Sequence, residues 1–198
     1  MKTTNTAAKY LAQPPLSLLD MISIGIMVVG FLLLAFLHRG VPVSLGILTI
    51  GLLIFIFSRA SRISDAAYEN EVTRLLRAHD ISETESGLLR AYDLSVLPVV
   101  KGRDGTWRSG IFVLTRVEVK EGQCHVTWYE ADLVARTVKE RQIFLDLPAN
   151  VYVAEKELII HNRENVMTRK LCFPDGTAIP ITTGTMAFEV IKKKLRMS

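Results

Sequence analysis

Residues 21–57 read MISIGIMVVGFLLLAFLHRGVPVSLGILTIGLLIFIF. Two runs of 17 residues without a charged side chain, 21–37 and 41–57, flank the short segment 38–40. At about 1.5 Å of rise per residue, each run makes a helix of about 26 Å, near the low end for a hydrocarbon core of about 30 Å. Because backbone groups in lipid must be satisfied internally, the sequence predicts a membrane hairpin of two α-helices.

Four glycines lie in these runs, in pairs at equal distances from His38: Gly25 with Gly51, and Gly30 with Gly46. Small residues let helices approach closely. A spacing of five residues turns a helix by about 500°, so the two glycines of one helix point in different directions. We expect membrane packing by all four, one in each helix facing the partner helix and the other a neighbouring copy. The alternative is that glycine is simply common in membrane helices.

The orientation of the hairpin follows from the basic residues near its ends. Lys2 and Lys9 precede the first helix, Arg59 and Arg62 follow the second, and only Arg39 lies in the turn. Both termini are therefore expected in the cytoplasm. A signal peptide followed by a buried core helix is the alternative, which the second apolar run and the missing small-residue cleavage site disfavour.

The composition of the whole chain limits its possible functions. The 198 residues carry 24 Lys and Arg against 20 Asp and Glu, a net charge of +4. That balance argues against a DNA-binding surface that rests on bulk charge. Cys124 and Cys172 are too few for a disulfide framework or a four-cysteine zinc site.

Changes of pattern along the chain predict four segments. A helical linker follows the hairpin and carries an apolar stripe at Tyr68, Val72, Leu75 and Leu76, with a new helix start at Ser64 or Asp65 left open. The predicted segments are an N-terminal cytoplasmic segment over 1–15, the transmembrane hairpin over 16–58, the linker over 59–87 and a cytosolic sensor domain over 88–198.

The last segment has the pattern of an all-β domain. Short runs rich in Val, Ile, Thr and aromatic residues alternate with turn signals such as 103–105 and 174–176. The local connections predict a small antiparallel β-barrel of about eight strands, closed by a short C-terminal helix over 186–197. A pleckstrin-homology-like barrel with seven strands is the alternative. The predicted strands are 88–92, 96–101, 111–119, 124–129, 136–147, 151–154, 158–162, 166–173 and 177–182.

Catalytic motifs are absent from the sequence. It contains no phosphate-binding loop, no zinc-protease helix motif and no nucleophile elbow, and its four histidines lack ligand spacing. We therefore expect no enzyme, no catalytic residue, no metal and no cofactor.

A binding module is the stronger hypothesis. Arginine guanidinium groups bind phosphates, and aromatic rings stack on bases. Trp128 and Tyr129 are neighbours on a strand, so only one of them points into the barrel. The candidate ligand-binding residues are Arg108, Arg116, Trp128, Tyr129 and Arg141.

The order of a two-helix membrane hairpin (21–37 and 41–57), a short linker and a minimal β domain within 198 residues resembles a family of CBASS antiphage membrane effectors. These are the two-transmembrane, β-barrel type, a functional counterpart of STING. The resemblance implies a multi-pass protein of the bacterial inner membrane. A partner nucleotidyltransferase makes a cyclic dinucleotide upon infection. The barrel binds this activating ligand, the protein oligomerises, and disruption of the bilayer kills the cell.

Two other functions remain open at the level of sequence. A pleckstrin-homology-like membrane scaffold would use the basic residues 192–196 at the inner leaflet. An accessory subunit of a membrane complex would use the hairpin only as an anchor.

Overall fold

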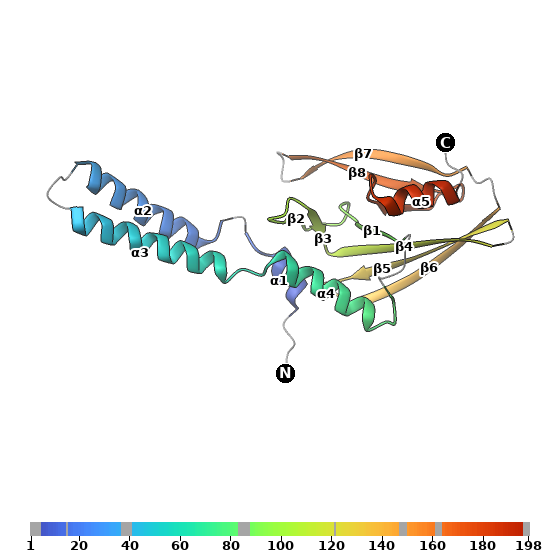
Figure 1. Ribbon diagram of the computed structural model, residues 1–198, viewed down its shortest axis with the longest axis horizontal. Helices are drawn as coiled ribbons and strands as arrows, with labels where there is room; N and C mark the ends of the chain where they lie inside the picture. Colours follow the sequence, from blue (N-terminus) through green and yellow to red (C-terminus); the bar gives the residue numbers. More distant parts are fainter. Residues whose placement is uncertain are drawn as a thin grey trace. The chain divides into compact units, whose positions relative to one another are not determined.

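The computed structural model of the chain describes residues 5–14, 16–36, 41–82, 88–120, 122–146, 150–160 and 164–195, and Figure 1 shows their helices and strands. The chain divides into two compact units. The helical unit is Ala12–Ser64, and the β unit combines Met1–Leu11 with Asp65–Ser198.

The helical unit confirms the predicted pair of apolar helices. Helix α2 covers Leu18–Phe36 and helix α3 covers Val41–Ala60, and the two pack along each other. Both are long and apolar enough to cross a membrane. The predicted turn over 38–40 lies outside the described residues.

A polar cluster ties the start of α2 to the end of α3. Ser17 and Asp20 form a reciprocal capping box, in which each backbone N–H donates to the other side chain at 3.1 and 2.9 Å. Arg62 donates to the buried Asp20 carboxylate, and the Ser17 and Ser58 hydroxyls lie 2.9 Å apart. A buried carboxylate needs such partners, so this cluster fixes how the two helix ends meet.

The β unit contains nine described strands and three helices, all pairs of strands being antiparallel. The strands are β1 (Leu89–Tyr92), β2 (Val99–Lys101), β3 (Trp107–Ser109), β4 (Ile111–Lys120), β5 (Gln123–Asp132), β6 (Thr137–Asp146), β7 (Tyr152–Ile160), β8 (Glu164–Cys172) and β9 (Ala178–Ile181). The helices are α1 (Thr6–Leu11), α4 (Asp65–Arg77) and α5 (Met186–Lys194).

The strands form three sheets, where we predicted one closed barrel. Their orders are β1-β4-β5-β6, β2-β3 and β7-β8-β9, and no closed barrel is found among the described residues. The sheets are held together by packing instead. Strand β1 lies beside β9, and the Thr182 hydroxyl donates to the Arg90 carbonyl at 2.9 Å. Strand β6 ends the four-stranded sheet within the described chain.

Alternation along the strands sends two sets of side chains to opposite faces of the four-stranded sheet. One face, with Val113, Val126 and Trp128, packs on the β7-β8-β9 sheet and α5. On the other face, Phe112 stacks edge-on against Tyr92, and α4 packs across β5 and β6. The predicted stripe of α4 is buried, with Tyr68, Val72 and Leu76 fully enclosed.

Several predicted elements need correction. The predicted helical linker over 59–87 is broken, and Asp65 begins α4, as the open alternative allowed; its residues 83–87 lie outside the described residues. The predicted strands 151–154 and 158–162 are one strand, β7, because Glu155 and Lys156 continue the pairing with β8 and both are exposed. Helix α1 and strand β3 were not predicted, since each is too short to show a period. Residues 147, 161–162 and 196–197 of predicted elements lie outside the described residues.

Candidate functional site

A hollow of about 240 Å³ opens where β1 and the start of β3 face β8 and β9. We call it the β1–β8 hollow. Its walls include Tyr92, Trp107, Thr168 and Lys170, from three different sheets. Ligand pockets commonly hold about 300–1,000 Å³. The hollow therefore has room for part of a nucleotide-sized ligand rather than for the whole of a dinucleotide.

Cations outnumber carboxylates in the walls of this hollow. Arg169 and Lys170, neighbours on β8, both line it, against the single carboxylate of Asp93. Arg169 pairs with Glu155 at 2.6 Å, and Lys170 lies 3.8 Å from Asp93. These side chains are partly exposed, and such ion pairs contribute only about 0–1 kcal/mol. A phosphate group can therefore replace the present partners at low cost.

Trp107 supplies the aromatic wall. Its half-buried ring packs on a small cluster formed by Val99, Ile160 and Val166. The Lys101 ammonium group lies 5.3 Å from the ring centroid. An indole held between apolar packing and a cation is a rigid surface on which a base can stack.

A second hollow, of about 200 Å³, contains two of the predicted ligand residues, Arg116 and Tyr129. Glu118 and Glu140 also line it, and Arg116 is paired with Glu118 at 3.0 Å. Its charged groups therefore sum to a net negative charge, which disfavours a phosphate. His125 packs edge-on against Phe144 here, with ring centroids 4.6 Å apart.

The other predicted ligand residues lie elsewhere. Trp128 is in the core, 5% exposed, and its indole N–H donates to Glu130 at 3.2 Å. Arg141 lies opposite Trp128 in the strand register and pairs with the same Glu130 at 3.4 Å. Arg108 is buried in a polar network of its own. The structure thus brings together Arg116 with Tyr129 and Trp128 with Arg141, but does not gather all five.

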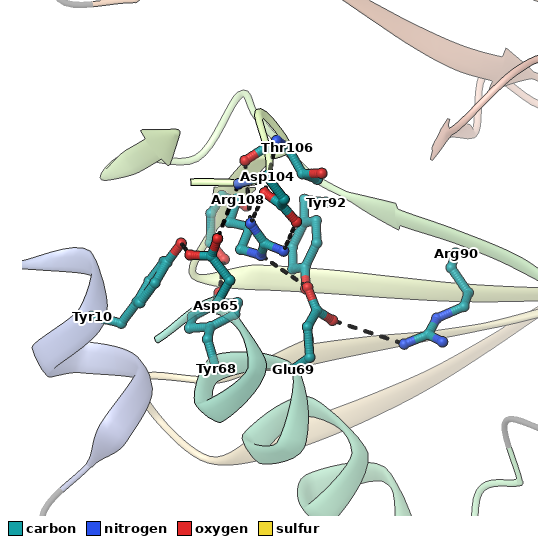
Figure 2. Close-up of polar contacts among 10 residues, drawn as sticks. Tyr10, Asp65, Tyr68, Glu69, Arg90, Tyr92, Asp104, Thr106 and Arg108 are labelled. Carbon is teal, nitrogen blue, oxygen red and sulfur yellow. Dashed lines mark hydrogen bonds and ion pairs between the residues drawn. The ribbon is translucent and has the colours of Figure 1, made fainter. Parts of the chain in front are cut away.

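The Arg108 network, drawn in Figure 2, shares Tyr92 and Thr106 with the walls of the β1–β8 hollow. Arg108 donates two hydrogen bonds to Asp104, at 2.9 and 2.7 Å, and one to Glu69 at 2.8 Å. Glu69 also accepts from the hydroxyl of Tyr92 at 2.9 Å. The hydrogen bonds from Arg108 lower the pKa of Asp104, and burial raises the pKa of Tyr92. Asp104 is therefore ionised at neutral pH, and Tyr92 is a neutral donor.

No match to this chain is found among protein-family models, curated proteins or solved structures. The function is therefore inferred from the geometry of the chain itself. Within the described residues, no group of three or more His, Cys, Asp or Glu side chains could hold a metal ion.

Sequence reasoning missed the residues that make the β1–β8 hollow. Arg169 and Lys170 are adjacent cations on one strand, and Trp107 directly follows a turn. Those local signals exist, but only the packing of Trp107 on the cluster of Val99, Ile160 and Val166 brings it to β8, the strand that carries Arg169 and Lys170.

Proposed function

We propose that this protein is an antiphage membrane effector gated by a cyclic dinucleotide. In this proposal the β unit is a cytosolic sensor, with its three sheets in the role of the family's barrel, and α2 and α3 span the bacterial inner membrane with both termini in the cytoplasm. The protein has no enzymatic step or cofactor of its own. A partner nucleotidyltransferase supplies the ligand, and ligand binding drives oligomerisation, membrane disruption and cell death.

The observation that carries the proposal is the union of two apolar helices with a β unit that offers a cationic, aromatic hollow. Lys170 and Arg169 provide positive charge for a phosphate, and Trp107 provides a stacking surface for a base. The hollow, about 240 Å³, is smaller than the pockets that usually hold a whole ligand. A two-fold symmetric ligand whose halves occupy the hollows of two copies satisfies this size limit.

The free energy required for such gating is modest. A ligand shifts an equilibrium only by its differential affinity for the two states. Moving an assembly from 1:99 to 99:1 takes about 5.5 kcal/mol. Two phosphates and two bases, bound only in the assembled form, supply interactions of that size.

Basic residues on α5 favour a second function. Lys192, Lys193 and Lys194 lie in its last turn, a pattern that binds anionic lipid in pleckstrin-homology-like scaffolds. The Lys194 ammonium donates to the Val117 carbonyl at 2.7 Å, so it does not point to a membrane surface. This leaves two described cations for a membrane surface, so we rank the scaffold second.

The test is a binding and leakage experiment on the full chain in lipid vesicles. Cyclic dinucleotides should bind and release an entrapped dye, and Lys170→Ala or Trp107→Ala should weaken binding. Arg116→Ala, in the net acidic hollow, is the matched control and should bind as the wild type does. Vesicles that stay sealed at saturating ligand would contradict the effector. Binding that follows the fraction of anionic lipid instead would support the scaffold.

A further inference from the structure

The chain passes between its two units twice, after Leu11 and before Asp65. One polar network includes a residue next to each of these two points. Residue Tyr10 lies two positions before the helical unit begins, and Asp65 is the first residue after it ends. The Tyr10 hydroxyl donates to the Asp65 carboxylate at 2.7 Å. Two segments separated by the whole membrane hairpin are thus joined by one hydrogen bond (Figure 2).

The same carboxylate reaches the turn between β2 and β3. The second oxygen of Asp65 accepts from the backbone N–H of Asp104 at 3.2 Å. Asp104 in turn holds Arg108 through both carboxylate oxygens, and Arg108 reaches Glu69 on the next turn of α4. The start of α4 is therefore held to this turn by bonds to two of its carboxylates.

This network borders the β1–β8 hollow through two shared residues. Tyr92 and Thr106 both line the hollow. Tyr92 donates to Glu69, and the Thr106 N–H donates to Asp104 at 3.0 Å. A ligand that displaces Tyr92 or Thr106 therefore breaks a bond to Glu69 or to Asp104, the two carboxylates that hold Arg108.

Gly102 shows how tightly the network is closed. A Cβ at this position would overlap Arg108 Nη1 and would lie 2.6 Å from an Asp104 carboxylate oxygen and 3.1 Å from Asp65 Cγ. Real Cβ atoms essentially never show contacts under 3.0 Å, so the contacts to Arg108 and Asp104 require a shift, whereas the contact to Asp65 is only tight. A methyl group at this position would push Asp104 and Arg108 away from Asp65 without removing any charge.

We propose that the network of Tyr10, Asp65, Glu69, Asp104 and Arg108 is a clamp that holds both ends of the membrane hairpin in the resting state, and that ligand in the β1–β8 hollow releases it. The proposal rests on the proposed function in one respect, namely that the hairpin responds to the β unit. Its physical basis is linkage, because breaking a bond made only in the resting state raises the population of the other state.

Tyr10→Phe removes one hydrogen bond to a carboxylate, and Gly102→Ala inserts the methyl group. The matched control is Tyr152→Phe, which removes the hydroxyl of an exposed tyrosine on β7. A hydrogen bond to a charged group is worth about 1.5–3 kcal/mol, so the ligand-free protein should shift about tenfold or more toward the released state.

Two measurements on the full chain in vesicles test the clamp. Hydrogen exchange at residues 6–11 and 65–77 should become about tenfold or more faster in Tyr10→Phe than in the control, without ligand. Dye release without ligand should rise with it. Exchange or basal dye release equal to that of the control would overturn the clamp. Gly102→Ala tests the same network by steric displacement and should give the same two changes. If Gly102→Ala does not fold, the result for Tyr10→Phe alone decides.

The outcomes separate the clamp from the proposed function. A wild-type protein that ignores cyclic dinucleotides while Tyr10→Phe exchanges faster and leaks more contradicts the ligand assignment and supports the clamp. A wild-type protein that binds and leaks on ligand addition, with Tyr10→Phe indistinguishable from the control, supports the effector and overturns the clamp.

Discussion

A Cβ on Gly30 of α2 would lie 2.9 Å from Cγ of Leu48 on α3. Gly51 on α3 is as tightly enclosed, since a Cβ there would lie 2.7 Å from Cγ of Met27. At Gly25 and Gly46 the same test meets nothing within 4 Å. Each helix therefore turns one glycine toward its partner and one away from it.

Gly30→Leu should separate α2 from α3, because no side chain fits against Leu48. Overpacking of this kind costs about 1–3 kcal/mol. The thermal stability of the full chain in detergent micelles should fall accordingly. Gly25→Leu is the matched control on the same helix, and its stability should equal that of the wild type. Equal stabilities for Gly30→Leu and Gly25→Leu would contradict the packing role of Gly30.

The exposed glycines test assembly separately. Gly25→Leu and Gly46→Leu should leave the hairpin and ligand affinity intact but weaken association between copies, as crosslinking in vesicles would measure. Unchanged crosslinking would show that these two positions do not lie between copies.

Thr115→Val should stabilise the β unit. Thr115 is fully buried in β4, and its hydroxyl has no hydrogen-bond partner among the described residues. An unsatisfied buried polar group costs about 1–3 kcal/mol, and valine has nearly the same shape. The urea midpoint of Thr115→Val should therefore lie above that of the wild type. A lower midpoint would indicate a partner for the hydroxyl.

Trp128→Ala and Tyr129→Ala should differ sharply. Trp128 lies in the core, and removing a buried tryptophan costs about 3–5 kcal/mol. Tyr129 is half-buried on the opposite face, and its removal should cost about 1 kcal/mol or less. Thermal unfolding of the two variants measures the difference. Equal losses of stability would contradict the assignment of Trp128 to the core face of β5 and of Tyr129 to the opposite face.

Stability should fall above about pH 10, the pKa of a free tyrosine. Burial first, and then the charge of Glu69, raise the pKa of Tyr68 and Tyr92 in the folded protein. Above that pH the unfolded chain releases these protons and the folded chain keeps them, so the stabilisation present at lower pH is lost. Each tyrosine contributes a slope of about 1.4 kcal/mol per pH unit.

Urea midpoints of the full chain across that pH range give the slope, and Tyr92→Phe should reduce it by one tyrosine's share. A midpoint that stays constant above about pH 10 would mean that these tyrosines ionise as freely as in the unfolded chain.

Most of the secondary structure followed from the sequence because its signals are local. The apolar runs predicted α2 and α3, and alternation predicted the strands 111–119 and 124–129. The structure buries Val113, Val126 and Trp128 of these strands in one core. Closure of the sheets is not a local property. Whether β6 or β1 meets a partner depends on packing between distant strands, and the barrel prediction was wrong for that reason within the described chain.

The candidate site was harder to predict than the fold. Arg108 is a predicted phosphate ligand, yet its guanidinium donates its hydrogen bonds to Asp104 and to Glu69, which lies 39 positions away. Trp107, its neighbour, was passed over although it lines the hollow. Long-range partners decide whether an arginine is structural or available, and a single sequence does not reveal them.

Strand β6 presents Lys139, Glu140, Arg141 and Gln142, all exposed, along the terminal strand of its sheet. Alternating charges on such a border discourage strand-to-strand fusion between molecules. In the proposed assembly, where many copies gather in one membrane, this protection matters more than it does for a dispersed protein. Replacing the three charged residues Lys139, Glu140 and Arg141 with neutral side chains should promote irreversible fibrous aggregation.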